Sequence, residues 1–196
     1  MKKIIVLATH NAGKIREFKS VLEPLGYSVT AVRDLCPDLQ EPEETGTTFE
    51  ENACLKASYY MKATGLPCLA DDSGIIADAL DGRPGVYSAR YAGPECDDQK
   101  NNQKLIDELS AFSPEQRTVH YVCVLALLFP DGHEIIKKGV CSGVLRDFYA
   151  GTNGFGYDPL FYVPEKGKTM AEMTMNEKNE ISHRGKALEQ LVEALS

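Results

Sequence analysis

The chain has 196 residues, of which 43% are hydrophobic and 26% are charged, an ordinary globular composition that excludes intrinsic disorder. At roughly 150 residues per domain, this length predicts a single domain over residues 1–196. The 21 Lys and Arg against 29 Asp and Glu give a formal net charge of −8 at pH 7, which argues against a binder of duplex nucleic acid because that class carries a basic face.

The amino-terminal segment has the pattern strand, loop, helix, strand. Residues 4–8 form a continuous apolar run, which is typical of a strand buried on both faces. A polar loop follows, and from Lys14 apolar residues recur at helical spacing until Gly26, where we expect the helix to end. Residues 27–32 are predicted to form a second strand. This order of elements favours an α/β architecture.

The middle of the chain begins with an acidic loop over residues 33–47. Thr47 and Glu50 have the spacing of a capping box, so we expect a helix that starts there and ends near Gly65. A short strand at residues 68–70 is predicted to lead directly into the polar sequence Asp-Asp-Ser-Gly at 71–74. Residues 97–109 are predicted to form a very polar helix.

The carboxy-terminal half is predicted to contain a hairpin, a loop and a last helix. Residues 118–129 and 133–144 have strand-like patterns, and the Asp131-Gly132 pair between them is a strong hairpin signal. The glycine-rich residues 151–156 must form a loop. In the last helix, residues 187, 188, 191, 192 and 195 give one apolar face, and Ser182 is a good residue to cap its start.

The six cysteines include no CxxC pair and no Cys–His spacing of the kind that binds zinc. The first apolar run is too short for the core of a signal peptide, and no run reaches about 18 apolar residues. We therefore expect a cytoplasmic protein with reduced thiols that mainly fill the core.

The loop before the first predicted helix is the first candidate site. It consists of Thr9, His10, Asn11, Ala12, Gly13 and Lys14. Amide groups at a helix start favour an anion and the lysine adds a positive charge, which together suggest phosphate binding. It is not a Walker A motif, since Ala8 and Ile15 replace the residues that this motif requires. The alternative is an ordinary turn with a solvated lysine.

The second candidate is the Asp71-Asp72-Ser73 segment at the predicted carboxyl end of a strand, where open α/β sheets bind ligands. Adjacent carboxylates repel each other, and Mg²⁺ bound by carboxylates and substrate phosphates would relieve that repulsion. The alternative is a turn in which the aspartates bond nearby backbone amides. Glu41, Glu43 and Glu44 of the acidic loop are possible further ligands, although each alone is an ordinary surface charge.

Two further candidates lie near the carboxy-terminus. Phe155 and Tyr157 alternate with glycines, which suggests a backbone that closes on a flat ligand stacked on a ring; the alternative is a turn whose rings serve the core. His183 and Arg184 follow the capping Ser182, where positive charge opposes the helix dipole. This unfavourable position hints that the pair has a function.

Taken together, these segments resemble the inosine/xanthosine triphosphate pyrophosphatase family, most closely its bacterial members. The resemblance rests on ordered matches across nearly the whole chain: Thr-His-Asn-Ala-Gly-Lys at 9–14, Glu-Glu-Thr-Gly at 43–46, Phe-Glu-Glu-Asn-Ala-Cys-Leu-Lys-Ala at 49–57, Ala-Asp-Asp-Ser-Gly at 70–74, Pro-Gly-Val-Tyr-Ser-Ala-Arg-Tyr at 84–91, Gly-Phe-Gly-Tyr-Asp-Pro at 154–159 and Ile-Ser-His-Arg at 181–184.

The resemblance implies an elongated, two-lobed α/β fold with a central mixed β-sheet, flanking helices and a substrate cleft between the lobes, usually as a homodimer. It also implies Mg²⁺-dependent hydrolysis of ITP, dITP and XTP to the nucleoside monophosphate and pyrophosphate, which removes deaminated purines from the nucleotide pool. Two alternatives stay open: a nucleotide-binding module without catalysis, and a pyrophosphatase that acts on modified pyrimidine nucleotides.

The resemblance also assigns roles to individual residues. Asp72 would be the general base and a metal ligand, with Glu44 as the second ligand. The triphosphate would lie on the loop at 9–14, above all on Thr9, Asn11 and Lys14, with Lys56 and Ser73 nearby. Phe155 would stack on the base, and the base and sugar end would be lined by Gly156, Tyr157, Asp158, Lys178, His183 and Arg184.

Overall fold

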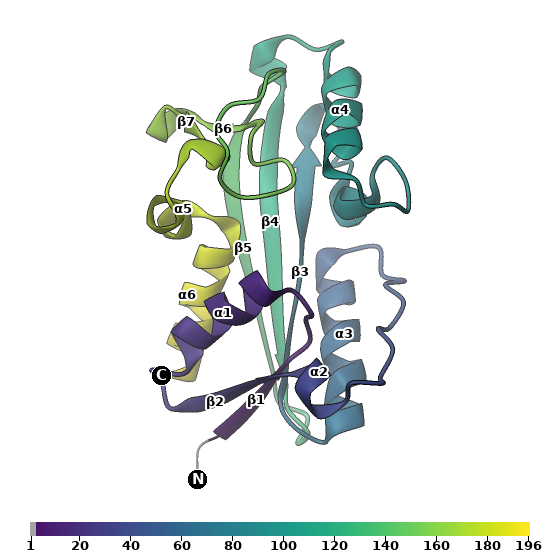
Figure 1. Cartoon of the computed structure of the whole chain (residues 1–196), viewed down its shortest axis with the longest axis vertical. Coiled ribbons are helices and arrows are strands. Elements are labelled where there is room, and N and C mark those ends of the chain that lie inside the picture. The colour runs from purple at the N-terminus through teal and green to yellow at the C-terminus, as the bar shows by residue number, and fades with distance from the viewer. Residues whose placement is uncertain (1–2) are drawn as a thin grey trace. The chain divides into compact units, whose positions relative to one another are not determined.

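The computed structural model describes residues 3–196 and contains a seven-stranded mixed sheet with flanking helices (Figure 1). The strand order is β2-β1-β3-β4-β5-β6-β7. The strands are β1 Lys3–Leu7, β2 Tyr27–Ala31, β3 Cys68–Ala77, β4 Thr118–Leu128, β5 Glu134–Leu145, β6 Phe161–Val163 and β7 Lys168–Thr169. β1 pairs in parallel with β2 and β3, whereas β6 pairs antiparallel with β5 and β7. The predicted α/β class with a mixed sheet is confirmed.

The longer helices form where the sequence pattern predicts them, but the first one ends at Leu22 and not at Gly26 as expected, and two short helices are additional. The helices are α1 Ala12–Leu22, α2 Val32–Leu35, α3 Phe49–Thr64, α4 Asp98–Leu109, α5 Met175–Ile181 and α6 His183–Leu195. α2 and α5 were not predicted, since four and seven residues give too little hydrophobic periodicity to detect. The hairpin between β4 and β5 forms as expected, with a hydrogen bond from Phe129 N to His133 O of 2.9 Å.

The described chain divides into two compact units, each with its own hydrophobic core. The first unit comprises the described residues up to Asp72, together with Cys123–Lys138 and Ala187–Ser196. The second unit comprises Ser73–Val122 and Gly139–Lys186.

Helices cover both faces of the sheet in the first unit. Phe18 of α1 and Leu191 of α6 pack in one core with Ile5 and Leu7 of β1. Val6 is fully buried as well, and it points to the opposite face because side chains alternate along a strand. α3 lies on that side (Figure 1). The prediction of a first strand buried on both faces is therefore confirmed for Ile5, Val6 and Leu7, whereas Ile4 is 41% exposed.

The core of the second unit combines α4 with strands and loops from later in the chain. Leu105 and Leu109 of α4 pack in one cluster with Ile75 of β3 and Leu160. The ring of Tyr121 stacks on Phe161, with ring centroids 4.4 Å apart.

The start of α3 differs from the prediction by one residue. Thr48 is the N-cap, and its Oγ1 accepts a hydrogen bond from Glu51 N at 3.1 Å. The Glu51 carboxylate accepts from Thr48 N, also at 3.1 Å, which completes the capping box. The predicted pair of Thr47 and Glu50 has the same spacing, but Thr47 instead donates to the Glu51 carboxylate. The predicted helix end is confirmed, because Gly65 adopts the left-handed conformation that closes a helix.

The structure corrects the prediction for β3, which was expected to end at Ala70. The strand continues to Ala77, so Asp71 and Asp72 lie in the middle of a strand and not in a turn at its carboxyl end. The prediction failed because Asp and Gly are depleted in strands and are typical of turns.

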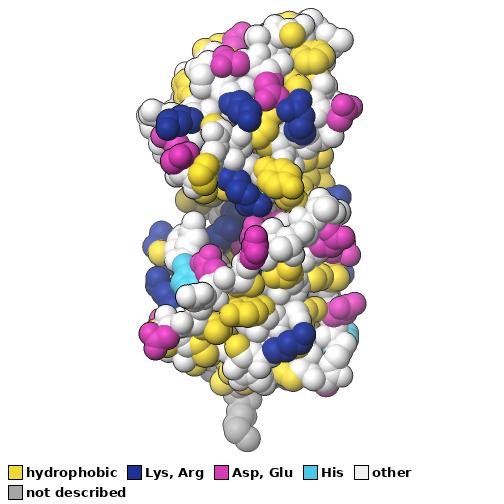
Figure 2. All heavy atoms as spheres, turned by 90° about the vertical axis from the view of Figure 1, so that its right-hand side faces the viewer, with side chains coloured by type: hydrophobic (Ala, Val, Ile, Leu, Met, Phe, Trp, Pro, Cys, Tyr) yellow, Lys and Arg dark blue, Asp and Glu magenta, His cyan; other side chains and the backbone are white. Residues whose placement is uncertain are grey.

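Figure 2 shows basic and acidic side chains mixed with hydrophobic ones over the face that it draws. Within residues 3–196, no helix has the length and apolar character needed to cross a lipid bilayer.

Candidate functional site

Two neighbouring aspartates of β3 carry the polar cluster of the first unit. Because side chains alternate along a strand, Asp71 and Asp72 point to opposite faces. Asp71 meets Lys14 of α1, with 2.7 Å between Oδ2 and Nζ. Asp72 meets Lys56 of α3, with 3.3 Å between Oδ1 and Nζ. Each carboxylate thus has a lysine from a different helix.

Lys56 joins Asp72 to the acidic loop. Its Nζ lies 2.7 Å from Glu44 Oε1 as well as 3.3 Å from Asp72 Oδ1, so the two carboxylates converge on one cation. Asn52, one helical turn before Lys56, donates from Nδ2 to Asp72 Oδ2 at 3.3 Å. Its Oδ1 accepts from Gly46 N at 2.8 Å, which ties the acidic loop to α3. Asn52 was not predicted, although its spacing of four from Lys56 places both on one helix face.

The ionisation of this cluster reflects burial and close opposite charges. Burial raises the pKa of the Asp72 carboxyl, and the Lys56 ammonium opposes this without cancelling it. Burial alone would lower the pKa of Lys56, but the carboxylates of Asp72, Asp71 and Glu44 together raise it. Asp72 is therefore a more basic carboxylate than a solvated aspartate, beside a lysine that stays charged.

In the loop at residues 9–14, at the start of α1, side chains accept hydrogen bonds from backbone amides of the same loop. Asn11 is the N-cap, and its Oδ1 accepts from the amides of Gly13 at 2.8 Å and Lys14 at 3.1 Å. These two amides, which we expected to face an anion, are therefore bonded to a side chain of the loop itself. Thr9 Oγ1 accepts from Asn11 N at 3.2 Å, and His10 Nε2 lies 3.3 Å from Glu41 Oε1. The structure pairs His10 with the acidic loop, whereas Lys14 reaches Asp71.

The oxygen donors of Glu44 and Asp72 suit a divalent cation that completes its coordination with other oxygens. Among residues 3–196, no group of three His, Cys, Asp or Glu side chains is close enough to hold a metal ion by itself. Mg²⁺ is commonly bound by one or two carboxylates together with substrate phosphates and water. The convergence of two carboxylates on one point fits that requirement.

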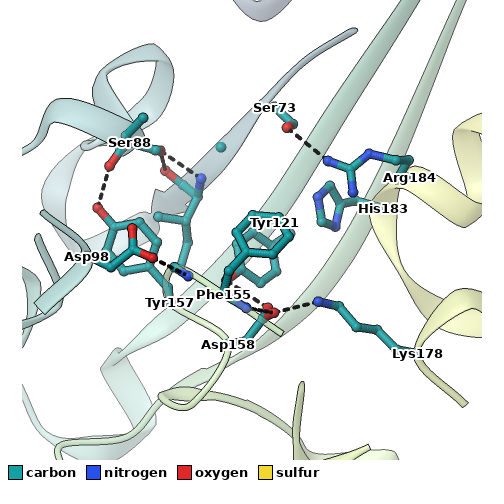
Figure 3. Close-up of a pocket in the computed structure, with 14 residues that line it drawn as sticks. Ser73, Ser88, Asp98, Tyr121, Phe155, Tyr157, Asp158, Lys178, His183 and Arg184 are labelled. Carbon is teal, nitrogen blue, oxygen red and sulfur yellow. Dashed lines mark hydrogen bonds and ion pairs between the residues drawn. The ribbon is translucent and has the colours of Figure 1, made fainter. Parts of the chain in front are cut away.

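A pocket in the second unit gathers the other predicted site residues (Figure 3). Its cavity measures about 150 Å³. Eight of the residues that line it were predicted from the sequence, namely Ser73, Phe155, Gly156, Tyr157, Asp158, Lys178, His183 and Arg184. Ser88, Asp98 and Tyr121 also line it and were not predicted. Ser88 lies in the 84–91 segment that contributes to the family resemblance, but no role was assigned to it. Asp98 and Tyr121 lie outside the quoted motifs, and no local pattern distinguishes them from surface or core residues.

The Asp158 carboxylate accepts several hydrogen bonds on one side of this pocket (Figure 3). It accepts from Tyr121 Oη at 3.2 Å, from Phe155 N at 3.0 Å, and from Lys178 Nζ in a short ion pair. Burial, together with the nearby Asp158 carboxylate, holds the pKa of Tyr121 well above its usual value. Tyr121 therefore remains a neutral donor, and its ring also stacks on His183 with centroids 4.8 Å apart.

The glycine-spaced aromatic run divides into one exposed and one buried ring. Phe155 is 62% exposed at the pocket, which rules out the alternative that it fills the core. Tyr157 is 5% exposed, and its Oη donates to Ser88 O at 2.7 Å. Gly154 must lack a side chain, because a Cβ there would lie 2.1 Å from Asp158 Oδ2.

His183 and Arg184 are buried in the first turn of α6, and both line the pocket. Arg184 Nη2 donates to Ser73 Oγ at 3.5 Å. Ser182 caps the helix as predicted, accepting from Gly185 N at 3.0 Å. The unfavourable position of the two basic side chains at a helix start is thus explained by the pocket into which they point.

The chain is similar to known proteins in both sequence and fold. The chain matches the model of the Ham1 family over residues 5–194. It is 52% identical over 184 residues to the dITP/XTP pyrophosphatase of Geobacter sulfurreducens, covering 94% of this chain and 92% of that protein. Among solved structures, it is similar to the Ham1 protein of Staphylococcus aureus, with a TM-score of 0.92, 44% identity and 98% of each chain covered. A HAM1 protein from Coxiella burnetii gives a TM-score of 0.93 at 43% identity, again over 98% of each chain. The chain belongs to the Ham1 family.

Proposed function

We propose that this protein hydrolyses the non-canonical purine nucleoside triphosphates dITP, XTP and ITP to the monophosphate and pyrophosphate. The observation that carries the proposal is the position of two chemically different clusters on consecutive residues of β3. Asp72 belongs to a cluster of lysines and carboxylates, and Ser73 lines a pocket with an exposed aromatic ring. The lysines suit a polyphosphate and the ring suits a base. The relative from Geobacter sulfurreducens has the matching name.

In this proposal, Lys14 and Lys56 bind the triphosphate with Thr9, Asn11 and Ser73. Both lysines are ion-paired with carboxylates, so the polyanion meets cations that are already held in place by these ion pairs. Asp72 acts as the general base that takes a proton from the attacking water. Its raised pKa suits that role, because a base works best when its pKa approaches the operating pH.

We propose Mg²⁺ as the cofactor, held by Glu44 and Asp72 with phosphate oxygens completing its coordination. When bound there, it supplies positive charge that offsets the negative charge of the phosphates. Lys56, which contacts both carboxylates, keeps them together and limits their mutual repulsion.

The pocket of the second unit would hold the base. Stacking on Phe155 contributes about 1–3 kcal/mol and accepts any base. Choice among purines therefore has to come from polar groups. Hypoxanthine and xanthine carry a 6-oxo acceptor where adenine carries a 6-amino donor, and the ammonium of Lys178 can only donate. A buried mismatch of this kind can discriminate by roughly 10⁴-fold.

A substrate panel tests the proposal. Pyrophosphate release is measured with Mg²⁺ for dITP, XTP, dATP and dGTP, with 5-methyl-UTP and pseudo-UTP beside them. We expect dITP and XTP to be turned over far faster than dATP and the modified pyrimidine nucleotides. Guanine also carries a 6-oxo group, so the rate with dGTP measures any discrimination against its 2-amino group. Preference for the modified pyrimidines would replace the proposed substrate class, and nucleotide binding without any product would identify a non-catalytic module. A homodimer and a cytoplasmic location stay predictions from the sequence resemblance.

A further inference from the structure

We infer that Asp98 and Asn102 of α4 are positioning residues that hold the backbone of Gly156 and thereby fix the exposed ring of Phe155 at the mouth of the pocket. This inference rests on the proposed function, in which Phe155 stacks on the base.

The two residues bind both backbone polar groups of one glycine. Asp98 Oδ2 accepts from Gly156 N at 2.9 Å (Figure 3). Asn102 Nδ2 donates to Gly156 O at 3.0 Å. Asp98 and Asn102 are four residues apart, so they lie one above the other on the same face of α4. Gly156 has a φ of 61°, in the left-handed region that favours glycine.

Phe155, the residue before Gly156, is held by Asp158. Phe155 N donates to Asp158 Oδ2 at 3.0 Å, so two successive amides and one carbonyl are each bonded to a side chain. Phe155 is 62% exposed, and its ring contacts the Lys178 ammonium, 5.5 Å from the ring centroid, so little packing holds the ring. Its place therefore depends on the backbone, which α4 restrains at Gly156 and Asp158 restrains at Phe155.

Asn102 is buried where α4 contacts Gly156. It is only 3% exposed, so its hydrogen bond to Gly156 O is formed away from water, where losing it is costly. Asn101 next to it is 2% exposed but bonds Ala89 O and Ala92 N instead. The tandem asparagines thus connect α4 to two separate walls of the pocket.

The test uses Asp98→Ala, with Asp98→Asn as the conservative variant that keeps an acceptor. Asp98 is exposed at the start of α4, so neither variant should prevent folding. Asp97→Ala is the matched control, because Asp97 caps the same helix through Lys100 N at 3.0 Å. We expect Asp98→Ala to raise KM for dITP about three- to tenfold with little change in kcat, as for lost uniform binding. Asp98→Asn and Asp97→Ala should stay near the wild-type KM.

Coupling to Phe155 makes the test specific. In a Phe155→Ala background, Asp98→Ala should cause no further rise in KM, since no ring remains to be placed. Equal rises for Asp98→Ala and Asp97→Ala, or full additivity with Phe155→Ala, would overturn the inference.

Hydrogen exchange keeps the inference testable if dITP is not turned over. Asp98→Ala should speed exchange of the Gly156 amide, whereas Asp97→Ala should not. Unchanged exchange at Gly156 in Asp98→Ala would refute the contact itself. Absence of dITP turnover in the wild-type protein would instead reject the proposed function.

Discussion

The proposed role of Asp72 as general base depends on how its environment differs from that of Asp71. Both are buried and both meet a lysine, and the lysine that meets Asp72 also meets a second carboxylate, Glu44. Burial raises the pKa of Asp72, which suits a proton acceptor. We expect Asp72→Asn to lower kcat by about 10²- to 10⁴-fold, the usual contribution of a positioned base, while the circular dichroism spectrum and Tm show an intact fold.

The control for this variant is Asp78→Asn in the second unit. Asp78 also pairs with a basic side chain, His120, at 3.1 Å, but it does not line the pocket. Its kcat should match that of the wild-type protein. A near-normal kcat for Asp72→Asn would remove Asp72 from the role of base.

Phe155 has a matched partner that separates stacking from general surface effects. Phe155→Ala should raise KM for dITP by about 5- to 150-fold, the equivalent of 1–3 kcal/mol of base stacking. Phe148 is similarly exposed, at 51%, but does not line the pocket, so Phe148→Ala should leave KM unchanged. Steady-state kinetics give KM for both variants. If KM of Phe155→Ala equals that of Phe148→Ala, Phe155 does not contact the base.

At the scale of elements, sequence patterns located the secondary structure better than they located the site. Hydrophobic periodicity identified α1, α3 and α6, because each buries a continuous stripe. It failed at β3, where Asp71 and Asp72 interrupt the strand signal and are accommodated only by Lys14 and Lys56 from helices distant in sequence. Motifs identified Phe155 and His183, but Asp98 is a pocket residue only because α4 packs beside that loop.

The capping box of α5 gives a prediction about acid stability. Glu177 accepts hydrogen bonds from the backbone of Thr174 and from Lys168, and these lower its pKa to about 2. In the unfolded chain, the pKa of a glutamate is about 4.3. The ionised Glu177 carboxylate therefore stabilises the folded state at pH values above about 4.3, and this contribution is lost as the pH falls toward 2. In Glu177→Gln we expect reduced stability at about pH 6, with a difference from wild type that shrinks on acidification.

Urea unfolding at several pH values measures this difference. Glu180→Gln changes an exposed glutamate of the same helix and serves as the control. A difference between Glu177→Gln and wild type that stays constant from about pH 6 to about pH 2.5 would show that the carboxylate does not act through its charge.

At the scale of the whole molecule, buried cysteines in each of the two units can be used to follow the unfolding of that unit's core. All six are free thiols. Cys68 and Cys123 are fully buried in the first unit and Cys141 is 4% exposed in the second, as expected for thiols that fill the core. Cys96 is exposed, so that expectation is wrong for it. Burial raises the pKa of Cys68 to about 12 and raises that of Cys141, which makes both poor nucleophiles.

Thiol labelling in increasing urea should therefore follow the opening of both units. Without denaturant, a maleimide should modify Cys96 rapidly and spare the three buried thiols, since only an exposed thiolate reacts. Residues of β3, β4 and β5 belong to both units, so loss of either core breaks strands that the other core needs. We accordingly expect Cys68, Cys123 and Cys141 to become reactive at the same urea concentration, as in a two-state transition. Mass spectrometry of the labelled peptides resolves the three sites, and labelling of Cys141 at a clearly different concentration from Cys68 would show that the two units unfold independently.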